Sequence, residues 1–173
     1  ATTLAGQTAS LYGANNAGSQ LPGKPNRVYW SKIGQPEAWP RINWLDVGSE
    51  RRRVLAICAT DRALYVFKEN EGIFRIFGDS DETFDVEPVD LKYKPIAAET
   101  VVAFDKRVWA LCDKGIVAVN EAGLEVMSND IQEELLRALI TSVTLADVAT
   151  MAWALPYESE SFCTFFLPGD RDI

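Results

Sequence analysis

Short apolar runs separated by polar turns fill the chain from residue 54 onward. The runs are about four to six residues long and rich in β-branched and aromatic residues, which is typical of strands. No helical pattern lies between them in residues 54–127, so parallel βαβ units are excluded and an antiparallel, mainly β fold is predicted. A β-rich run also stands at Val28–Trp30. The later predicted strands are residues 54–58, 63–68, 73–77, 84–89, 100–104, 108–112, 116–120, 124–127, 150–155 and 162–167.

Residues 1–26 have a different texture from the rest of the chain. They carry one charge, at Lys24, and are rich in Gly, Ala, Ser, Thr and Asn. Their apolar residues follow no sustained period, and such a segment alone buries too little surface to offset the entropy of ordering it. We therefore expect an extended arm or linker at 1–26, ordered against a neighbouring subunit, and a β region at 27–173.

One helix is predicted, at residues 129–140. Asn129 is a suitable N-cap, and Gln132 would complete a weak capping box. Spacings of four, seven and eight residues place apolar side chains on one helix face. That face consists of Ile131, Leu135, Ala138 and Leu139.

An internal repeat organises the β region. Residues 54–76 and 100–119 both run strand, polar turn, strand, acidic turn, glycine, strand, at a spacing of about 43 to 46 residues. This spacing is that of a four-stranded propeller blade. Gly72 and Gly115 stand at matching turns, where a tight hairpin needs a positive φ. The fold expected is therefore a partial β-propeller of antiparallel blades, with one short helix and an extended N-terminal arm.

The repeat units are expected at about 54–99, 100–128 and 150–173, the last of them incomplete. Two or three blades do not close a propeller. The chain begins with Ala1, and turn residues follow its last strand-like run directly. We therefore expect it to be a segment of a longer polypeptide.

The composition excludes several kinds of catalytic and metal-binding site. The 173 residues include no histidine, which removes Ser–His and Cys–His nucleophile pairs and histidine-bearing zinc sites. No Walker loop or GxSxG motif occurs, so we expect neither catalysis nor a cofactor. The net charge of −8 argues against a general nucleic-acid binder, and the basic run Arg51–Arg53 is read as a solvated loop. The cysteines Cys58, Cys112 and Cys163 lie in apolar runs and are expected to be buried free thiols, as in a reducing cytosol.

Two residue sets leave alternatives open. The stretch 79–90 holds six carboxylates, of which Asp79, Asp81 and Asp85 are weak candidates for calcium ligands. A solvated loop and strand face is the favoured interpretation, and a glycosidase would have to use Asp81, Glu82 or Asp85. The aromatic set either stacks on sugars or bases or, more often, fills cores between blades. Its members are Trp30, Trp39, Trp44, Trp109 and Trp153.

Four motifs follow one another between residues 27 and 140. RVYWSK at 27–32 precedes GQPEAW at 34–39, and ALYVFK at 63–68 precedes GIFRIFG at 72–78. VWALCDKGIVAVN follows at 108–120, and then MSNDI at 127–131, before the predicted helix. In this order the motifs resemble those of phage tail hub and tail nozzle propellers, a family that includes the packaged-DNA stabilisation and tail tubular proteins of short-tailed phages.

The resemblance implies a structural virion protein rather than an enzyme. It implies a ring of copies of the chain, often a hexamer, with DNA passing through it only as cargo. Adaptor or portal proteins and tail fibres or spikes would be its neighbours. The location implied is the virion tail, assembled in the host cytoplasm, with no membrane contact before infection. This chain is much shorter than a whole nozzle protein. The alternative functions are a receptor- or carbohydrate-binding propeller and a glycosidase domain.

Overall fold

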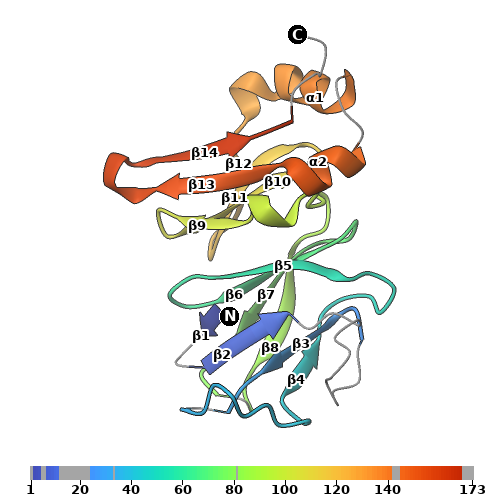
Figure 1. Ribbon diagram of the computed structural model, residues 1–173. Coiled ribbons are helices and arrows are strands. Elements are labelled where there is room, and N and C mark those ends of the chain that lie inside the picture. Colours follow the sequence, from blue (N-terminus) through green and yellow to red (C-terminus); the bar gives the residue numbers. More distant parts are fainter. Residues whose placement is uncertain are drawn as a thin grey trace.

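The structure is a computed structural model that describes residues 2–4, 7–11, 24–32, 34–80, 82–141 and 145–168. Antiparallel strands dominate it, which confirms the predicted mainly β, antiparallel class. The described residues form three four-stranded sheets and a hairpin, and within each of them a strand pairs with the next one along the chain (Figure 1). The first sheet is β1 (Thr2–Leu4), β2 (Gln7–Leu11), β3 (Arg27–Trp30) and β4 (Trp44–Asp46). The second is β5 (Val54–Ala59), β6 (Leu64–Lys68), β7 (Gly72–Phe77) and β8 (Asp85–Asp90). The third is β9 (Val102–Phe104), β10 (Arg107–Cys112), β11 (Gly115–Asn120) and β12 (Gly123–Val126). The C-terminal hairpin is β13 (Trp153–Tyr157) and β14 (Phe162–Phe166).

The sheets lie in layers in the order of the sequence, with the first sheet at the bottom of Figure 1 and the C-terminal hairpin near the top. Alternation along β6 explains the stacking, because successive side chains of a strand point to opposite faces. Leu64 and Val66 join a cluster shared with Val28 of the first sheet. Tyr65 and Phe67 join a second cluster, shared with the third sheet. The second sheet is therefore buried on both faces.

The first strands of successive layers lie against one another. β1 contacts β5, β5 contacts β9, and β9 contacts β13. Among the last strands, β8 contacts β12. The first strands of all four layers are thus lined up along one edge, and the last strands of the second and third sheets also meet.

Segment 1–26, predicted to be an extended arm or linker, contains two strands of the first sheet. β2 pairs with β3 through Ala9 and Trp30, Ser10 and Tyr29, and Leu11 and Val28. This differs from the arm that composition suggested. β2 pairs with β1 within the segment and with β3 outside it, and the pairing with β3 is one that no local pattern in the segment encodes.

The helical region also differs from the prediction. A 3₁₀ turn at Asn129–Ile131 precedes α1 (Gln132–Thr141), and α2 (Leu145–Met151) follows. The predicted strand at 150–155 was therefore wrong at its start, since residues 150–151 end α2 and β13 starts at residue 153. Two more 3₁₀ turns of the same length occur at Ala98–Thr100 and Glu158–Glu160. Within the described part of the chain, no helix has the length and apolar character needed to cross a bilayer.

The predicted capping box does not form. The Asn129 side-chain amide donates to the Val126 carbonyl oxygen, and the Gln132 amide donates to the Lys114 carbonyl oxygen. The 3₁₀ turn delays the α-helix, so Asn129 is not at its N-cap. Ile131 is exposed, whereas Leu135 is buried against the third sheet with Leu111. The side chains of Ala138 and Leu139 lie outside the described residues.

Candidate functional site

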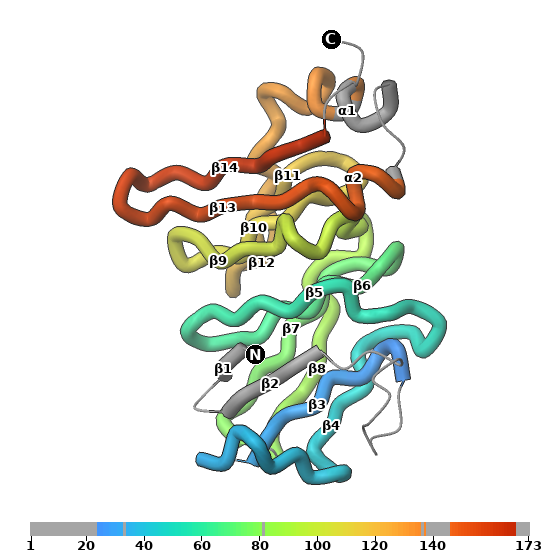
Figure 2. Tube along the Cα trace, viewed as in Figure 1, coloured from blue at the N-terminus to red at the C-terminus, as the bar shows by residue number. Residues whose placement is uncertain are grey.

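Hairpin turns from three layers meet along one side of the molecule. The β5–β6 turn (residues 60–63), the β9–β10 turn (105–106) and the β13–β14 turn (158–161) all lie on the left of Figure 2. Three adjoining hollows, of about 470, 420 and 470 Å³, are lined by these turns and by the β11–β12 turn (121–122). We call this region the turn groove. It is the site that the fold itself creates, because meanders that stack in order project equivalent turns on one side.

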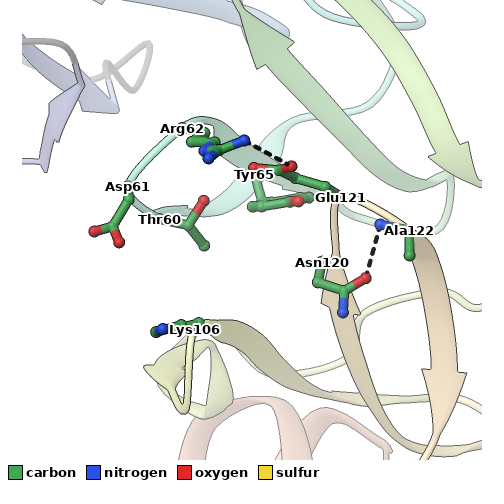
Figure 3. Close-up of a pocket in the computed structure, with 8 residues that line it drawn as sticks. All are labelled: Thr60, Asp61, Arg62, Tyr65, Lys106, Asn120, Glu121 and Ala122. Carbon is green, nitrogen blue, oxygen red and sulfur yellow. Dashed lines mark hydrogen bonds and ion pairs between the residues drawn. The ribbon is translucent and has the colours of Figure 1, made fainter.

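The first hollow of the turn groove lies between the second and third sheets (Figure 3). Arg62 on the β5–β6 turn lies 3.7 Å from a carboxylate oxygen of Glu121 on the β11–β12 turn. Asn120 Oδ1 accepts a hydrogen bond of 2.9 Å from the Ala122 backbone N–H, which shapes that turn. An ion pair between turns of different sheets therefore borders the hollow. The lining residues are Thr60, Asp61, Arg62, Tyr65, Lys106, Asn120, Glu121 and Ala122.

Lys106 lines all three hollows. The neighbouring cations have partners, since Arg62 faces Glu121 and Arg107 lies 2.6 Å from Glu125. Lys106 has no ion-pair partner among the residues that the structure describes. Its ammonium group is therefore available to a ligand in the turn groove.

The backbone of the β9–β10 turn is unusual. Asp105 and Lys106 have φ values of 50° and 58°, and they join a two-residue hairpin closed by the pair Phe104 and Arg107. Positive φ at both central residues is the geometry of a type I′ turn, in which Asn and Gly are preferred. Holding a lysine in the left-handed region costs about 1–2 kcal/mol. Strain of this kind concentrates at sites that bind or switch.

Tyr65 lines the first hollow and is fully buried. Burial raises the pKa of its hydroxyl, and the nearby Arg75 guanidinium opposes that shift. Tyr65 is therefore a neutral phenol at pH 7. It contributes packing in the core rather than negative charge in the turn groove.

The turn groove suits binding of polar groups better than catalysis. It offers carboxylates on several turns, the Lys106 ammonium and Phe104. With no histidine in the chain, the hydroxyl groups that line it, those of Thr60, Tyr65 and Ser161, have no imidazole base. No group of three metal-ligating side chains gathers anywhere in the described residues.

The acidic candidates from the sequence do not line the turn groove. Asp79 and Asp85 are both exposed, and Asp85 Oδ1 accepts a hydrogen bond of 2.8 Å from the next backbone N–H, that of Val86. Asp81 lies outside the described residues. Glu82 is exposed in the turn before β8. Neither a calcium cage nor a glycosidase pair is assembled from the described members of this set.

Two other carboxylates of the acidic stretch have structural partners. Glu87 pairs with Arg75 on the neighbouring strand β7. Asp90 Oδ1 accepts hydrogen bonds from the backbone N–H groups of Lys92 and Tyr93, at 2.6 and 2.9 Å. These carboxylates fix the strand and the turn after it.

The two predicted turn glycines begin β7 and β11. Gly72 has a φ of 152° and Gly115 a φ of 134°. A Cβ on Gly72 would overlap the Asp90 carbonyl oxygen and lie 2.9 Å from the Leu91 Cα, and one on Gly115 would overlap the Ser128 hydroxyl. Besides the positive φ, the close approach of residues 90–91 to Gly72 and of Ser128 to Gly115 is thus a second reason for glycine at these positions.

The tryptophans divide between core and surface. Trp30 packs edge-on against Phe84 at 5.1 Å between ring centroids, while Trp109 donates its indole N–H to the Phe104 carbonyl oxygen at 3.2 Å. Trp39 is half-buried. Trp44 and Trp153 are exposed on the first sheet and on the C-terminal hairpin. Trp30 thus occupies a core position as predicted, whereas Trp44 and Trp153 do not.

The three cysteines are free thiols. Cys112 is buried, but Cys58 and Cys163 are only half-buried, which corrects the expectation that all three are buried. Burial raises the pKa of each thiol, that of Cys58 to about 11. Since the thiolate is the reactive form, none of them is an activated nucleophile at neutral pH.

Local patterns in the sequence did not indicate the turn groove. Lys106 stands in an ordinary polar turn, and its place becomes distinctive only when the second and third sheets stack. The available signal was the regular spacing of the turns along the repeat. No protein-family model and no curated protein matches the chain. Its class is therefore inferred from its own fold and residues.

Proposed function

We propose that the chain is a structural segment of a β-propeller in a phage tail, part of a ring-shaped hub or nozzle through which DNA passes. The observation that carries the propeller is the line of contacts between first strands, from β1 to β5, β9 and β13. In a propeller the first strands surround a central channel and each sheet is one blade. The three four-stranded sheets are then complete blades, and the hairpin β13–β14 is the inner half of a fourth.

Three further features support a structural role. The second sheet is buried on both faces, as blades between neighbours are. The order of motifs from residue 27 to residue 140 is similar to that of tail hub and nozzle propellers. The net charge of −8 favours passage of DNA over its retention, since a channel wall of negative charge repels phosphate.

The proposal expects copies of the chain to form rings, with a hexamer as the expected number. The 19.2 kDa chain would then sediment as a species near six times that mass, and electron microscopy would show particles with a central opening. A chain that stays monomeric or dimeric at all concentrations, without rings in the presence of tail adaptor proteins, would contradict the ring.

A receptor- or carbohydrate-binding propeller is the second candidate, and the turn groove favours it. Loops on one side of a propeller are well placed to bind a ligand, and Asp61, Asn120 and Lys106 offer hydrogen bonds to hydroxyl groups. A glycan array probed with the wild-type chain and with Lys106→Ala tests this candidate. Binding that disappears in the variant would support it, and an array without signal would exclude the glycans tested.

A further inference from the structure

The outer face of the C-terminal hairpin is apolar and uncovered. The register pairs Trp153 with Phe166, Leu155 with Thr164 and Tyr157 with Phe162, so these six side chains share one face. We call it the hairpin face. Its five large apolar side chains are 42–49% exposed. The opposite face of the hairpin carries Ala154 and Phe165, which turn towards the core.

The aromatic side chains of the hairpin face are already arranged in pairs. The rings of Trp153 and Phe166 are stacked, with 4.0 Å between centroids and 12° between planes. Tyr157 and Phe162 lie 5.3 Å apart at the other end of the hairpin. Leu155 stands between the two pairs, opposite Thr164. The result is a preformed apolar surface whose centre is Leu155.

We infer that the hairpin face is a self-association surface that packs against the same face of a second copy of the chain, about a two-fold axis. The area suits such a dimer. Five large side chains at a little under half exposure present roughly 500 Å² in one copy, and two copies would bury about 1,000 Å², the lower bound for a specific interface. In a two-fold contact the same patch meets itself, so this area counts twice.

Charge points to the same occupant. The chain carries a net charge of −8, so most contacts between two copies bring like charges together. The hairpin face has no charged residue among its six members. Five of the eleven large exposed apolar side chains of the described residues lie on this face. The surface of a second copy that best complements it is therefore the same face.

This inference does not rest on the proposed function, in which a further blade rather than a second copy of the chain would cover the hairpin face. A two-fold contact closes on itself, whereas a ring needs a second, head-to-tail contact elsewhere on the chain. Loss of the dimer would therefore leave the ring proposal standing, and the reverse also holds.

The first test measures the association of the wild-type chain and two variants by sedimentation over a concentration series. Leu155→Asp buries a charge at the centre of the proposed interface and should weaken the dimer by about 30-fold or more, as for an interface hot spot. Leu91→Asp is the matched control, because Leu91 is an exposed leucine on the turn after β8, and it should leave the dimer unchanged. Circular dichroism verifies that both variants fold. A wild-type chain that forms no dimer, or a dimer that Leu155→Asp leaves intact, would overturn the inference.

The second test addresses the two-fold geometry. Leu155→Asp and Leu155→Lys should each lose the two-fold dimer, and an equimolar mixture of them should regain it, because residue 155 of one copy faces residue 155 of the other. In a head-to-tail contact, residue 155 would face a different residue and mixing would restore nothing. Absence of restored association would therefore overturn the two-fold arrangement.

Discussion

The ammonium nitrogen of Lys68 lies 2.7 Å from a carboxylate oxygen of Glu71, and the lysine side chain is completely buried. Lys68 also donates to the carbonyl oxygens of Val47 and Ser49, at 2.7 and 2.6 Å. The other Glu71 oxygen accepts the Ser49 backbone N–H at 2.8 Å. One buried cation thus ties the loop after β4 to the β6–β7 turn.

Replacing Lys68 by methionine should destabilise the chain by about 2–4 kcal/mol. The variant keeps the apolar stem but leaves the Val47 and Ser49 carbonyl oxygens and the Glu71 carboxylate without their donor. Urea unfolding followed by tryptophan fluorescence measures the loss. Lys92→Met, on an exposed lysine, is the control and should change the free energy of unfolding by less than about 0.5 kcal/mol. Equal effects of the two variants would contradict the role given to Lys68.

Gly72→Ala should cost more stability than Gly123→Ala. Both glycines have positive φ, 152° and 130°, so both variants introduce backbone strain. A Cβ at residue 72 also overlaps backbone of residues 90–91, whereas nothing lies within 4 Å of one at residue 123. We expect a loss of about 1 kcal/mol for Gly123→Ala and at least about twice that for Gly72→Ala. Comparable thermal midpoints would mean that backbone strain alone matters at Gly72.

The ion pair between Arg27 and Asp46 should make stability depend on pH. Arg27 Nε lies 2.6 Å from Asp46 Oδ1, and this hydrogen bond holds the pKa of Asp46 below its usual value. A carboxyl whose pKa is lowered by folding stabilises the protein above its unfolded pKa and loses that contribution as the pH falls through the folded value. Asp46→Asn should therefore lose about 1–3 kcal/mol at pH 7.

The difference between wild type and Asp46→Asn should shrink as the pH falls below about 4. Urea midpoints at pH 7 and at pH 3 measure this. Glu50→Gln removes the exposed partner of Lys24 and serves as the control, with an expected effect below about 0.5 kcal/mol at either pH. A difference for Asp46→Asn that is the same at both pH values would contradict the pairing.

Alkylation of Cys58 in the folded chain should be slow at pH 8. With its pKa raised to about 11, the thiol is only on the order of one part in a thousand ionised there, against roughly a quarter for a free cysteine. Peptide mapping after a timed iodoacetamide pulse, with the urea-unfolded chain as reference, gives the rate for each cysteine. A native Cys58 that reacts as fast as the unfolded one would contradict the protected environment.

Lys106→Gly should stabilise the chain by up to about 1 kcal/mol. Glycine relieves the positive φ of 58°, although its greater freedom in the unfolded chain offsets part of the gain. Lys106→Ala keeps the strain and removes the charge, so it should not be stabilising. Thermal unfolding of the two variants separates backbone strain from charge at the centre of the turn groove.

Local patterns predicted those strands whose turns are also local. The run 73–77 lies within β7, and 108–112 lies within β10, because turn residues bound each run and side chains alternate within it. β4 was missed, since three residues at Trp44–Asp46 are too few to show a period. In α2, Leu145–Met151 mixes good helix formers with apolar residues that suit a strand equally well.

Features that depend on stacking were beyond the sequence. Lys68 stands at the end of a strand, where a lysine usually meets solvent, and it is buried by a loop some 20 residues earlier in the chain. The hairpin face had a partial signal, because residues 153–157 and 162–166 are apolar on both faces. Which face meets the core depends on how the hairpin packs on the third sheet, where Phe165 joins the cluster that contains Leu111.

The burial of β6 on both faces has a consequence for how the chain comes apart. Each layer contacts mainly the layers before and after it, so stability resembles that of a linear array, in which the end units loosen first. The backbone amides of Val66 and Phe67 lie in the layer that is covered on both sides, so they should exchange with deuterium last. The second sheet is then the unit that persists when both ends have opened, and the template on which the neighbouring layers reassemble.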